Sequence, residues 1–210
     1  MEISSEKNTI TSSQYKICVS GAAKVDHCGA EVETIARQLG REIAQQGAVL
    51  VDGATSGFPL FASQGAKEVG GVVIGFSPAA TKHQHEHMYR LPTQYHDVII
   101  YTGFGYSGRD IILTQSSDAV IIGCGRIGTF HEFTTAFEDR RPIGVLEGAW
   151  ATHEIIKDII SKARGEHISI AFDSDPGKLV KKVIALIKEH RLERETEQDA
   201  LNEIRDLSSQ

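Results

Sequence analysis

A glycine-rich turn after an apolar run is the segment of this sequence best suited to hold a phosphate. Residues 123–128 read Gly-Cys-Gly-Arg-Ile-Gly, follow the apolar run 118–122 and open an expected helix. Such a turn exposes backbone N–H groups and the positive end of the helix dipole, and both favour an anion. A second turn of the same pattern at 103–108 indicates that the pattern is not specific, and the alternative is that both are simply tight strand-to-helix turns.

The side chains that follow the first turn could complete such a site. Thr129 and Glu132 are three residues apart at the start of the expected helix, so they share a face beside the turn. A hydroxyl and a carboxylate at these positions suit a phosphate and a pair of sugar hydroxyls. Alternatively, Glu132 is an acid in the first turns of a helix that complements the helix dipole and does nothing else.

A dinucleotide site is a further hypothesis for the same turn. Glu147 follows the run 142–146, where an acidic residue can accept hydrogen bonds from a ribose. The chain would then be an NAD(P)-dependent oxidoreductase. However, the motif lies late in the chain, and little sequence remains for a second mononucleotide-binding half or a substrate domain.

The string Gly125-x-x-Gly128-Thr129-x-x-Glu132 resembles the P-G-G-x-G-T-x-x-E signature of the Lonely Guy (LOG) proteins, which have also been described as lysine decarboxylase-like. Arg109 stands nine residues before the segment that begins at 118, which is the spacing of that family's essential arginine. The resemblance covers about residues 16–163. It is closest to an uncharacterised bacterial branch of the superfamily.

The chain departs from the LOG signature at three positions. Cys124 replaces the leading proline, Arg126 replaces the second glycine, and Arg109-Asp110 replaces an arginine-lysine pair. The side chain of Arg126 could crowd the phosphate or clamp it.

The resemblance implies a Rossmann-like, usually homodimeric protein that cleaves the N-glycosidic bond of a nucleoside 5′-monophosphate to free base and ribose 5-phosphate. In that reaction Glu132 would bind the ribose and orient the attacking water, and Arg109 would assist departure of the base. No cofactor or catalytic metal is implied. The residues that the resemblance assigns to nucleotide and phosphate binding are Gly21, Gly53, Gly123, Gly125, Arg126, Gly128 and Thr129. Some relatives only bind nucleotides or a molybdenum cofactor, so a non-catalytic carrier or sensor is the alternative.

Other metal-binding or redox patterns in the sequence are weak. The polar segment 77–97 holds four histidines without an accompanying cysteine or paired carboxylate, so we expect a solvated or partner-facing loop in preference to a metal site. These are His83, His85, His87 and His96. The three cysteines, Cys18, Cys28 and Cys124, show no zinc or redox spacing, and such a sparse, odd set is typical of a reducing cytosol.

An alternation of apolar runs and helical periodicities must position these residues. Strands are expected at 16–20, 48–51, 72–76, 98–101, 118–122, 142–146 and 168–171, and helices at 30–46, 58–69, 109–117, 128–139, 151–163 and 176–190. Strands that are apolar throughout predict a parallel sheet covered on both faces, and hence a doubly wound, Rossmann-like α/β domain. Ligands then bind beyond the carboxyl ends of the strands. If 98–101 and 118–122 are adjacent strands, Arg109 and Glu132 emerge about 4.8 Å apart plus side-chain reach.

Length and composition set the domain plan and exclude some partners. The 210 residues are enough for a polar N-terminal tail (1–14), one nucleotide-binding domain (15–190) and a charged, helical C-terminal tail (191–210). We favour a solvated C-terminal tail over one that docks on a partner subunit. The net charge of −6 argues against a nucleic-acid partner. No apolar run approaches the roughly 20 residues of a membrane span, and the polar start suggests no signal peptide. We therefore expect a cytoplasmic protein whose partners are a nucleoside monophosphate and a second copy of the chain.

Overall fold

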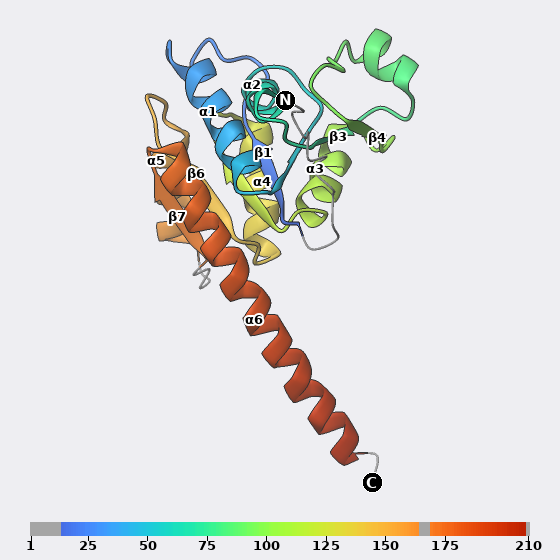
Figure 1. Ribbon diagram of the computed structural model, residues 1–210, viewed down its shortest axis with the longest axis vertical. Coiled ribbons are helices and arrows are strands. Elements are labelled where there is room, and N and C mark those ends of the chain that lie inside the picture. Colours follow the sequence, from blue (N-terminus) through green and yellow to red (C-terminus); the bar gives the residue numbers. More distant parts are fainter. Residues whose placement is uncertain (1–13, 164–168, 209–210) are drawn as a thin grey trace, which may run out of the picture.

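Seven parallel strands form one sheet in the order β4-β3-β2-β1-β5-β6-β7 (Figure 1). The computed structural model describes residues 14–163 and 169–208, so most of the expected N-terminal tail lies outside the described residues. The strands are β1 (Lys16–Ser20), β2 (Val49–Asp52), β3 (Val73–Ser77), β4 (Val98–Tyr101), β5 (Ala119–Ile122), β6 (Ile143–Leu146) and β7 (Ile170–Asp173). The predicted doubly wound, Rossmann-like α/β fold is confirmed.

The strand order reverses between β1 and β5, at the centre of the sheet. β2, β3 and β4 extend the sheet to one side of β1, and β5, β6 and β7 extend it to the other. Ser20 pairs with Ile122, so the two central strands end at the same level. In open parallel sheets, ligands bind in the crevice outside such a switch point.

Helices cover both faces of the sheet. They are α1 (Val32–Gln45), α2 (Phe58–Glu68), α3 (Gly105–Gln115), α4 (Ile127–Glu138), α5 (Thr152–Lys162) and α6 (Pro176–Ser208). Alternate residues of the central strands feed two separate cores. Ile17 and Val19 pack toward α1, α2 and α6, whereas Cys18, between them, packs with Leu113 of α3 and Phe133 of α4. Burial on both faces explains why these strands read as continuous apolar runs.

The expected adjacency of strands 98–101 and 118–122 is wrong. β4 is an edge strand, and β3, β2 and β1 separate it from β5. The chain must therefore cross back over the sheet from β4 to β5, and α3 makes this crossing and packs against α4. Helix-to-helix packing, in place of neighbouring strands, brings Arg109 toward Glu132.

Two helices differ from their predicted bounds by more than two residues. α3 begins at Gly105, four residues earlier than expected, so Arg109 lies in its second turn and not at its start. α6 does not end near 190 but continues to Ser208 and extends well beyond the body of the domain (Figure 1). Among the described residues, no helix is both long and apolar enough to cross a membrane.

The four histidines of the 77–97 segment do not form one cluster, because the rings of His83 and His87 lie 4.6 Å apart while His85 and His96 have other partners. His85 lies on a short π-helix (Gln84–Met88), is fully buried, and makes hydrogen bonds with the Ser77 hydroxyl and the carbonyl of Pro92. His96 is buried against Asp52, with its Nε2 atom 2.8 Å from Oδ1. Burial lowers the pKa of His96, but the Asp52 carboxylate raises it more, so the net shift is upward. Both buried histidines thus fasten this segment to the sheet, which the sequence did not predict.

Candidate functional site

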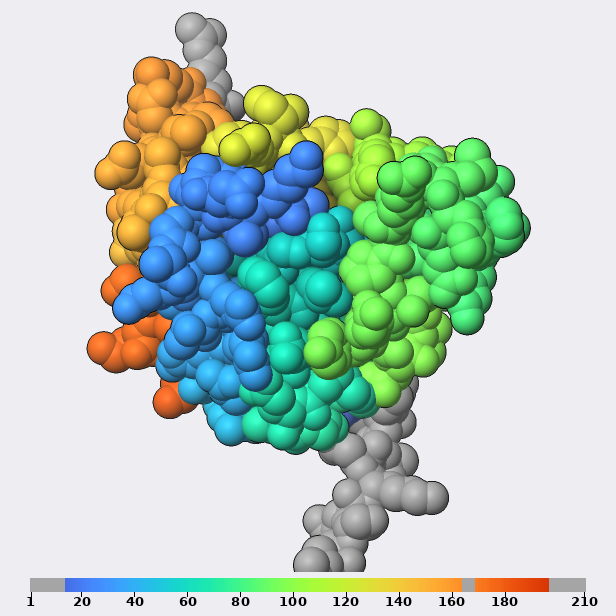
Figure 2. Space-filling model, turned by 90° about the horizontal axis from the view of Figure 1, so that it is seen from above, coloured from blue at the N-terminus to red at the C-terminus, as the bar shows by residue number. Residues whose placement is uncertain are grey.

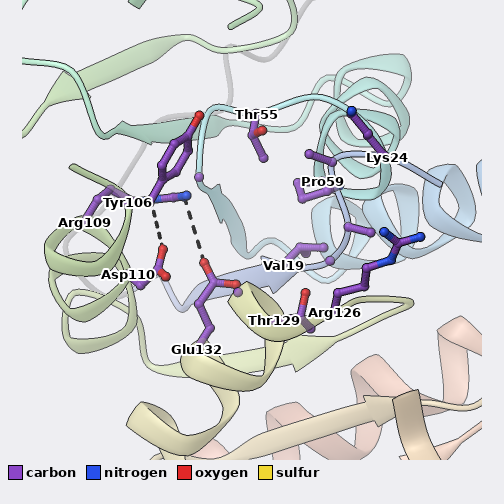
Figure 3. Close-up of a pocket in the computed structure, with 15 residues that line it drawn as sticks. Val19, Lys24, Thr55, Pro59, Tyr106, Arg109, Asp110, Arg126, Thr129 and Glu132 are labelled. Atoms are coloured by element: carbon purple, nitrogen blue, oxygen red, sulfur yellow. Dashed lines mark ion pairs between the residues drawn. The ribbon is translucent and has the colours of Figure 1, made fainter. Parts of the chain in front are cut away.

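A cavity of about 400 Å³ opens at the carboxyl ends of the central strands (Figure 3). Its walls come from β1, the loops after β1, β2 and β5, the start of α2, and the first two turns of α3 and α4. The polar and charged side chains that line it are Lys24, Thr55, Tyr106, Arg109, Asp110, Arg126, Thr129 and Glu132. The cavity therefore lies at the switch point, and its volume is in the range of small-molecule sites.

The start of α4 faces this cavity with unsatisfied donors. Arg126 is the N-cap residue but its side chain makes no capping hydrogen bond, and the first turn has no acidic residue. The first N–H groups of a helix have no partner within the helix. One donor of the turn is already used, because the Gly125 N–H donates to the Thr152 hydroxyl at 2.9 Å, and that hydroxyl donates back to the Gly125 carbonyl at 3.1 Å. The donors left for an anion are those of residues 127–129.

The predicted glycines have separate structural roles. Gly21 and Gly123 leave room for the Phe58 ring, since a Cβ at either position would overlap that ring. Gly53 lies directly under the Arg109 guanidinium, and Gly125 lies against the Thr129 side chain. Only Gly128 has open space around it. Gly21, Gly53 and Gly128 line the cavity, whereas Gly123 supports it from the core.

Arg109, Asp110 and Glu132 form a buried charge cluster on one wall (Figure 3). Arg109 Nη1 lies 3.9 Å from Glu132 Oε1, and Arg109 Nε lies 3.2 Å from Asp110 Oδ1. The Ser20 hydroxyl donates a hydrogen bond to the other oxygen of Glu132. His131 Nδ1 lies 3.0 Å from Asp110 Oδ2. The single guanidinium of Arg109 thus pairs with two buried carboxylates, those of Asp110 and Glu132.

Burial, together with the neighbouring charges, shifts the pKa of Glu132. Burial raises its pKa, Arg109 lowers it, Asp110 raises it again, and the result is a pKa of about 7. A carboxyl group with a pKa near neutrality can hold or release a proton under physiological conditions. Shifts of this kind are common at functional sites.

We expect Glu132→Gln to stabilise the protein at pH 8. The pKa of Glu132 is raised on folding, so the folded state binds the proton more tightly and its stability falls as pH rises from about 4.5 to about 7. Removing the ionisable group should recover about 2–3 kcal/mol of unfolding free energy at pH 8 and almost none near pH 4.5. Urea unfolding at both pH values measures the free energy of unfolding. Glu138→Gln is the control, because Glu138 is an exposed residue of the same helix. Equal stability of Glu132→Gln and wild type at pH 8 would contradict the assignment.

Several residues at the cavity were not predicted. Ser20 ends β1, Tyr106 places its ring 6.0 Å from the Arg109 guanidinium carbon, and Lys24 lies on the loop after β1. Asp110 was noticed only as a departure from the LOG signature. The position of Ser20 at a strand end next to the switch point is the one signal that could have identified it.

Two of the cysteines form a disulfide, although their sequence spacing shows no redox motif and the sparse set was expected to be typical of a reducing cytosol. Cys28 and Cys124 are joined by a disulfide, with their Cα atoms 5.8 Å apart. They lie 96 residues apart in sequence, so no local spacing could reveal them. The loop after β1 (dark blue) lies beside the start of α4 (yellow) in Figure 2. His27 Nε2 is 3.7 Å from each sulfur. These three side chains form the one group in the described part of the chain with the spacing of metal ligands.

Glu147 does not face this cavity. Its carboxylate is paired with Lys157 Nζ at 2.5 Å, and it is absent from the lining. Glu147, on which the oxidoreductase hypothesis depends, therefore forms an ion pair outside the cavity.

Comparison with known proteins identifies a matching family model and similar solved structures. A family model described as the SLOG cluster4 family matches residues 14–180. An uncharacterised protein of Archaeoglobus fulgidus is 30% identical over 132 residues, which are 63% of this chain and 82% of that protein. The molybdenum cofactor binding protein of Rippkaea orientalis has a TM-score of 0.66 and 28% identity, covering 85% of this chain and 98% of that one. The molybdenum cofactor carrier protein of Chlamydomonas reinhardtii has a TM-score of 0.67 and 29% identity, covering 83% and 99%.

Proposed function

The chain belongs to the SLOG cluster4 family, within the LOG-like superfamily that its glycine motif resembles, and we propose that it binds and carries a phosphate-bearing heterocyclic small molecule. Nucleotides and the molybdenum cofactor share this chemistry. The phosphate would sit at the start of α4, and the heterocycle would extend along the cavity toward Tyr106.

The observation that carries the proposal is the uncapped start of α4 inside a cavity with three cationic side chains. Lys24, Arg109 and Arg126 all line the cavity. A phosphate there would cap the helix, accept N–H bonds from residues 127–129, and gain charge-assisted bonds from the guanidinium groups. Arg126, which stands where LOG proteins have a glycine, lines the cavity, so its guanidinium can donate to the phosphate there.

Binding without turnover is favoured over hydrolysis for two reasons. Two of the structural neighbours similar over nearly their whole length are a binding protein and a carrier of the molybdenum cofactor. In addition, Asp110 stands where LOG proteins have a lysine. Its carboxylate pairs with the Arg109 guanidinium, which is the group that would assist a leaving base.

Hydrolysis of a nucleoside monophosphate is the second candidate, and the pKa of Glu132 favours it. A carboxylate with a pKa of about 7 could take a proton from the attacking water, while the departing base accepts a hydrogen bond from Arg109 and takes its proton from solvent. The bond from the ribose carbon to the base nitrogen would break as the bond from that carbon to the water oxygen forms.

We expect nucleoside 5′-monophosphates to bind the protein without release of free base. Incubation with a panel of monophosphates, followed by chromatography for free base, measures release, and calorimetry on the same samples measures binding. If the wild type releases free base in molar excess over protein, and Glu132→Ala does not, the protein is a hydrolase and the carrier proposal is overturned. The expected loss in that variant is about 10²-fold or more.

We also propose that the protein is a homodimer. Large apolar side chains are exposed beside the cavity: Phe104 is 69% exposed, Ile111 of α3 is 42% exposed, and Ile127 at the start of α4 is 82% exposed. Covering these side chains would remove apolar surface from water. Light scattering should give about 46 kDa, which is twice the chain mass of 22.9 kDa. A mass of one chain at working concentration would contradict the proposal.

A further inference from the structure

We propose that Cys28 and Cys124 form a reversible thiol–disulfide site that controls the anion-binding turn. Only the expected effect on ligand affinity rests on the proposed function, because the redox chemistry is argued from the contacts of the two cysteines and His27. Cys124 lies within the turn, between Gly123 and Gly125, and Cys28 lies on the loop after β1. The disulfide therefore joins the two loops that meet at the switch point.

His27 links this sulfur pair to the cavity. Its Nε2 atom lies 3.7 Å from both sulfurs, and its Nδ1 atom lies 3.1 Å from Arg126 Nη2. A guanidinium can only donate, so Nδ1 accepts this hydrogen bond and the proton of the neutral ring is on Nε2. That N–H faces the sulfurs, where it stabilises a thiolate over a thiol. A metal ion bound by the sulfurs would need the Nε2 lone pair instead, so the contact with Arg126 favours redox chemistry over metal binding.

The third cysteine provides an internal contrast. Cys18 in β1 is the free cysteine of the described residues, and it is as buried as Cys28 and Cys124, so the contrast lies in its lack of a sulfur partner and in its pKa. Burial, followed by the charges of Glu132 and Asp52, raises its pKa well above the ordinary value. Cys18 should therefore remain a thiol under conditions in which the pair reacts.

The exchange requires a small thiol or disulfide as co-reactant. Cys28 is itself 1% exposed, so a small dithiol can reach its sulfur only when the loop after β1, which is exposed on both sides of Cys28, moves aside. The thiolate of the dithiol then attacks Cys28, and the sulfur–sulfur bond breaks to release Cys124 as the thiolate beside His27. The second thiol of the reagent then displaces Cys28, and the reagent leaves as a disulfide with two protons taken up by the protein thiols. Oxidation by a low-molecular-weight disulfide is the reverse, and the two electrons pass to that reagent. Reversible disulfides in cytosolic proteins commonly have such a sensing role.

The effect on the site follows from the connections of the turn. When the disulfide opens, the turn and the loop after β1 remain joined by the hydrogen bond from the Ala22 N–H to the Cys124 carbonyl, at 2.7 Å. The turn thus stays in place but is held less rigidly. Arg126, which lines the cavity, loses a fixed partner when His27 moves with the released thiolate. We expect the reduced protein to bind a phosphate monoester about tenfold more weakly than the oxidised protein.

The first measurement concerns the thiols alone. The full-length protein is equilibrated in graded mixtures of reduced and oxidised glutathione, quenched with an alkylating reagent under denaturing conditions, and weighed by mass spectrometry. One cooperative step of two alkyl groups is expected, and peptide mapping should assign it to Cys28 and Cys124. His27→Gln should slow the exchange severalfold without abolishing the step. A pair that stays reduced throughout, or a disulfide that a dithiol cannot reduce in the folded protein, would overturn the proposal.

The second measurement is the affinity for ribose 5-phosphate in both redox states. The Cys28→Ser/Cys124→Ser double variant should bind like the reduced protein in both buffers, whereas Cys18→Ser should keep the redox response. Equal affinity in the two states would overturn the coupling. If neither state binds the probe but the two-thiol step is present, the proposed function fails and the redox pair stands. If the reduced protein binds zinc stoichiometrically and this binding requires His27, the three side chains form a metal site and the redox assignment is overturned.

Discussion

Replacing Gly125 with alanine is expected to lower the affinity for a phosphate monoester by about 10²-fold or more. A Cβ at this position would overlap the Oγ1, Cβ and Cγ2 atoms of Thr129, so the first turn of α4 must shift. That shift moves the N–H donors of residues 127–129 away from the anion. Two lost charge-assisted hydrogen bonds, at about 1.5–3 kcal/mol each, account for the effect. Calorimetry with ribose 5-phosphate measures it.

Two variants separate this effect from unfolding. Gly128→Ala adds a Cβ that meets no atom within 4 Å, so its stability should match that of the wild type. Thr129→Val keeps the shape of a buried side chain but removes its hydroxyl, and a loss of about tenfold in affinity is expected. If Gly125→Ala binds the phosphate monoester as tightly as the wild type, the anion does not lie at the start of α4.

Replacing Arg109 with alanine is expected to have the largest effect on stability. Arg109 is 5% exposed and, among the described residues, is the guanidinium that pairs with the buried carboxylates of Asp110 and Glu132. Without it, two buried carboxylates face each other, and breaking such a group by removing one partner costs about 3–5 kcal/mol. Ligand affinity should also fall, by about 10-fold or more, because a donor to the phosphate or the heterocycle is lost.

A double variant tests whether charge is the cause. Arg109→Ala/Glu132→Gln removes one cation and one carboxylate, so most of the lost stability at pH 8 should return while affinity stays low. Gly53→Ala is a milder variant of the same kind, since its Cβ would overlap the guanidinium and displace it without removing its charge. If the double variant is no more stable than Arg109→Ala at pH 8, the loss reflects the missing side-chain volume and not the charges.

Local sequence pattern predicted most strands and helices because burial on both faces leaves a clear apolar run. Val120 and Ile121 of β5, for example, are both fully buried although they face opposite sides of the sheet. Strand order was not available from the same pattern, because an edge strand with two apolar residues exposed on one face, Val98 and Ile100, still reads as an apolar run. The assumption that β4 lies beside β5 failed for this reason.

The candidate site could be predicted only in part. The turn and Glu132 are local features of one segment, and the arginine came from the LOG resemblance. Contacts between distant segments could not be predicted, because sequence spacing carries no information about them. The Thr152 hydroxyl uses the Gly125 N–H, Ser20 meets Glu132 across 112 residues, and Cys28 meets Cys124 across 96.

A titration of the isotope-labelled protein with ribose 5-phosphate, followed by amide NMR, tests the central claim most directly. The amides of residues 127–129 should shift with saturation, and ribose without the phosphate should leave them unchanged. The Gly125 amide should shift less, because its N–H is already bonded to Thr152. Shifts confined to another surface, or equal responses to ribose and ribose 5-phosphate, would contradict a phosphate site at the start of α4.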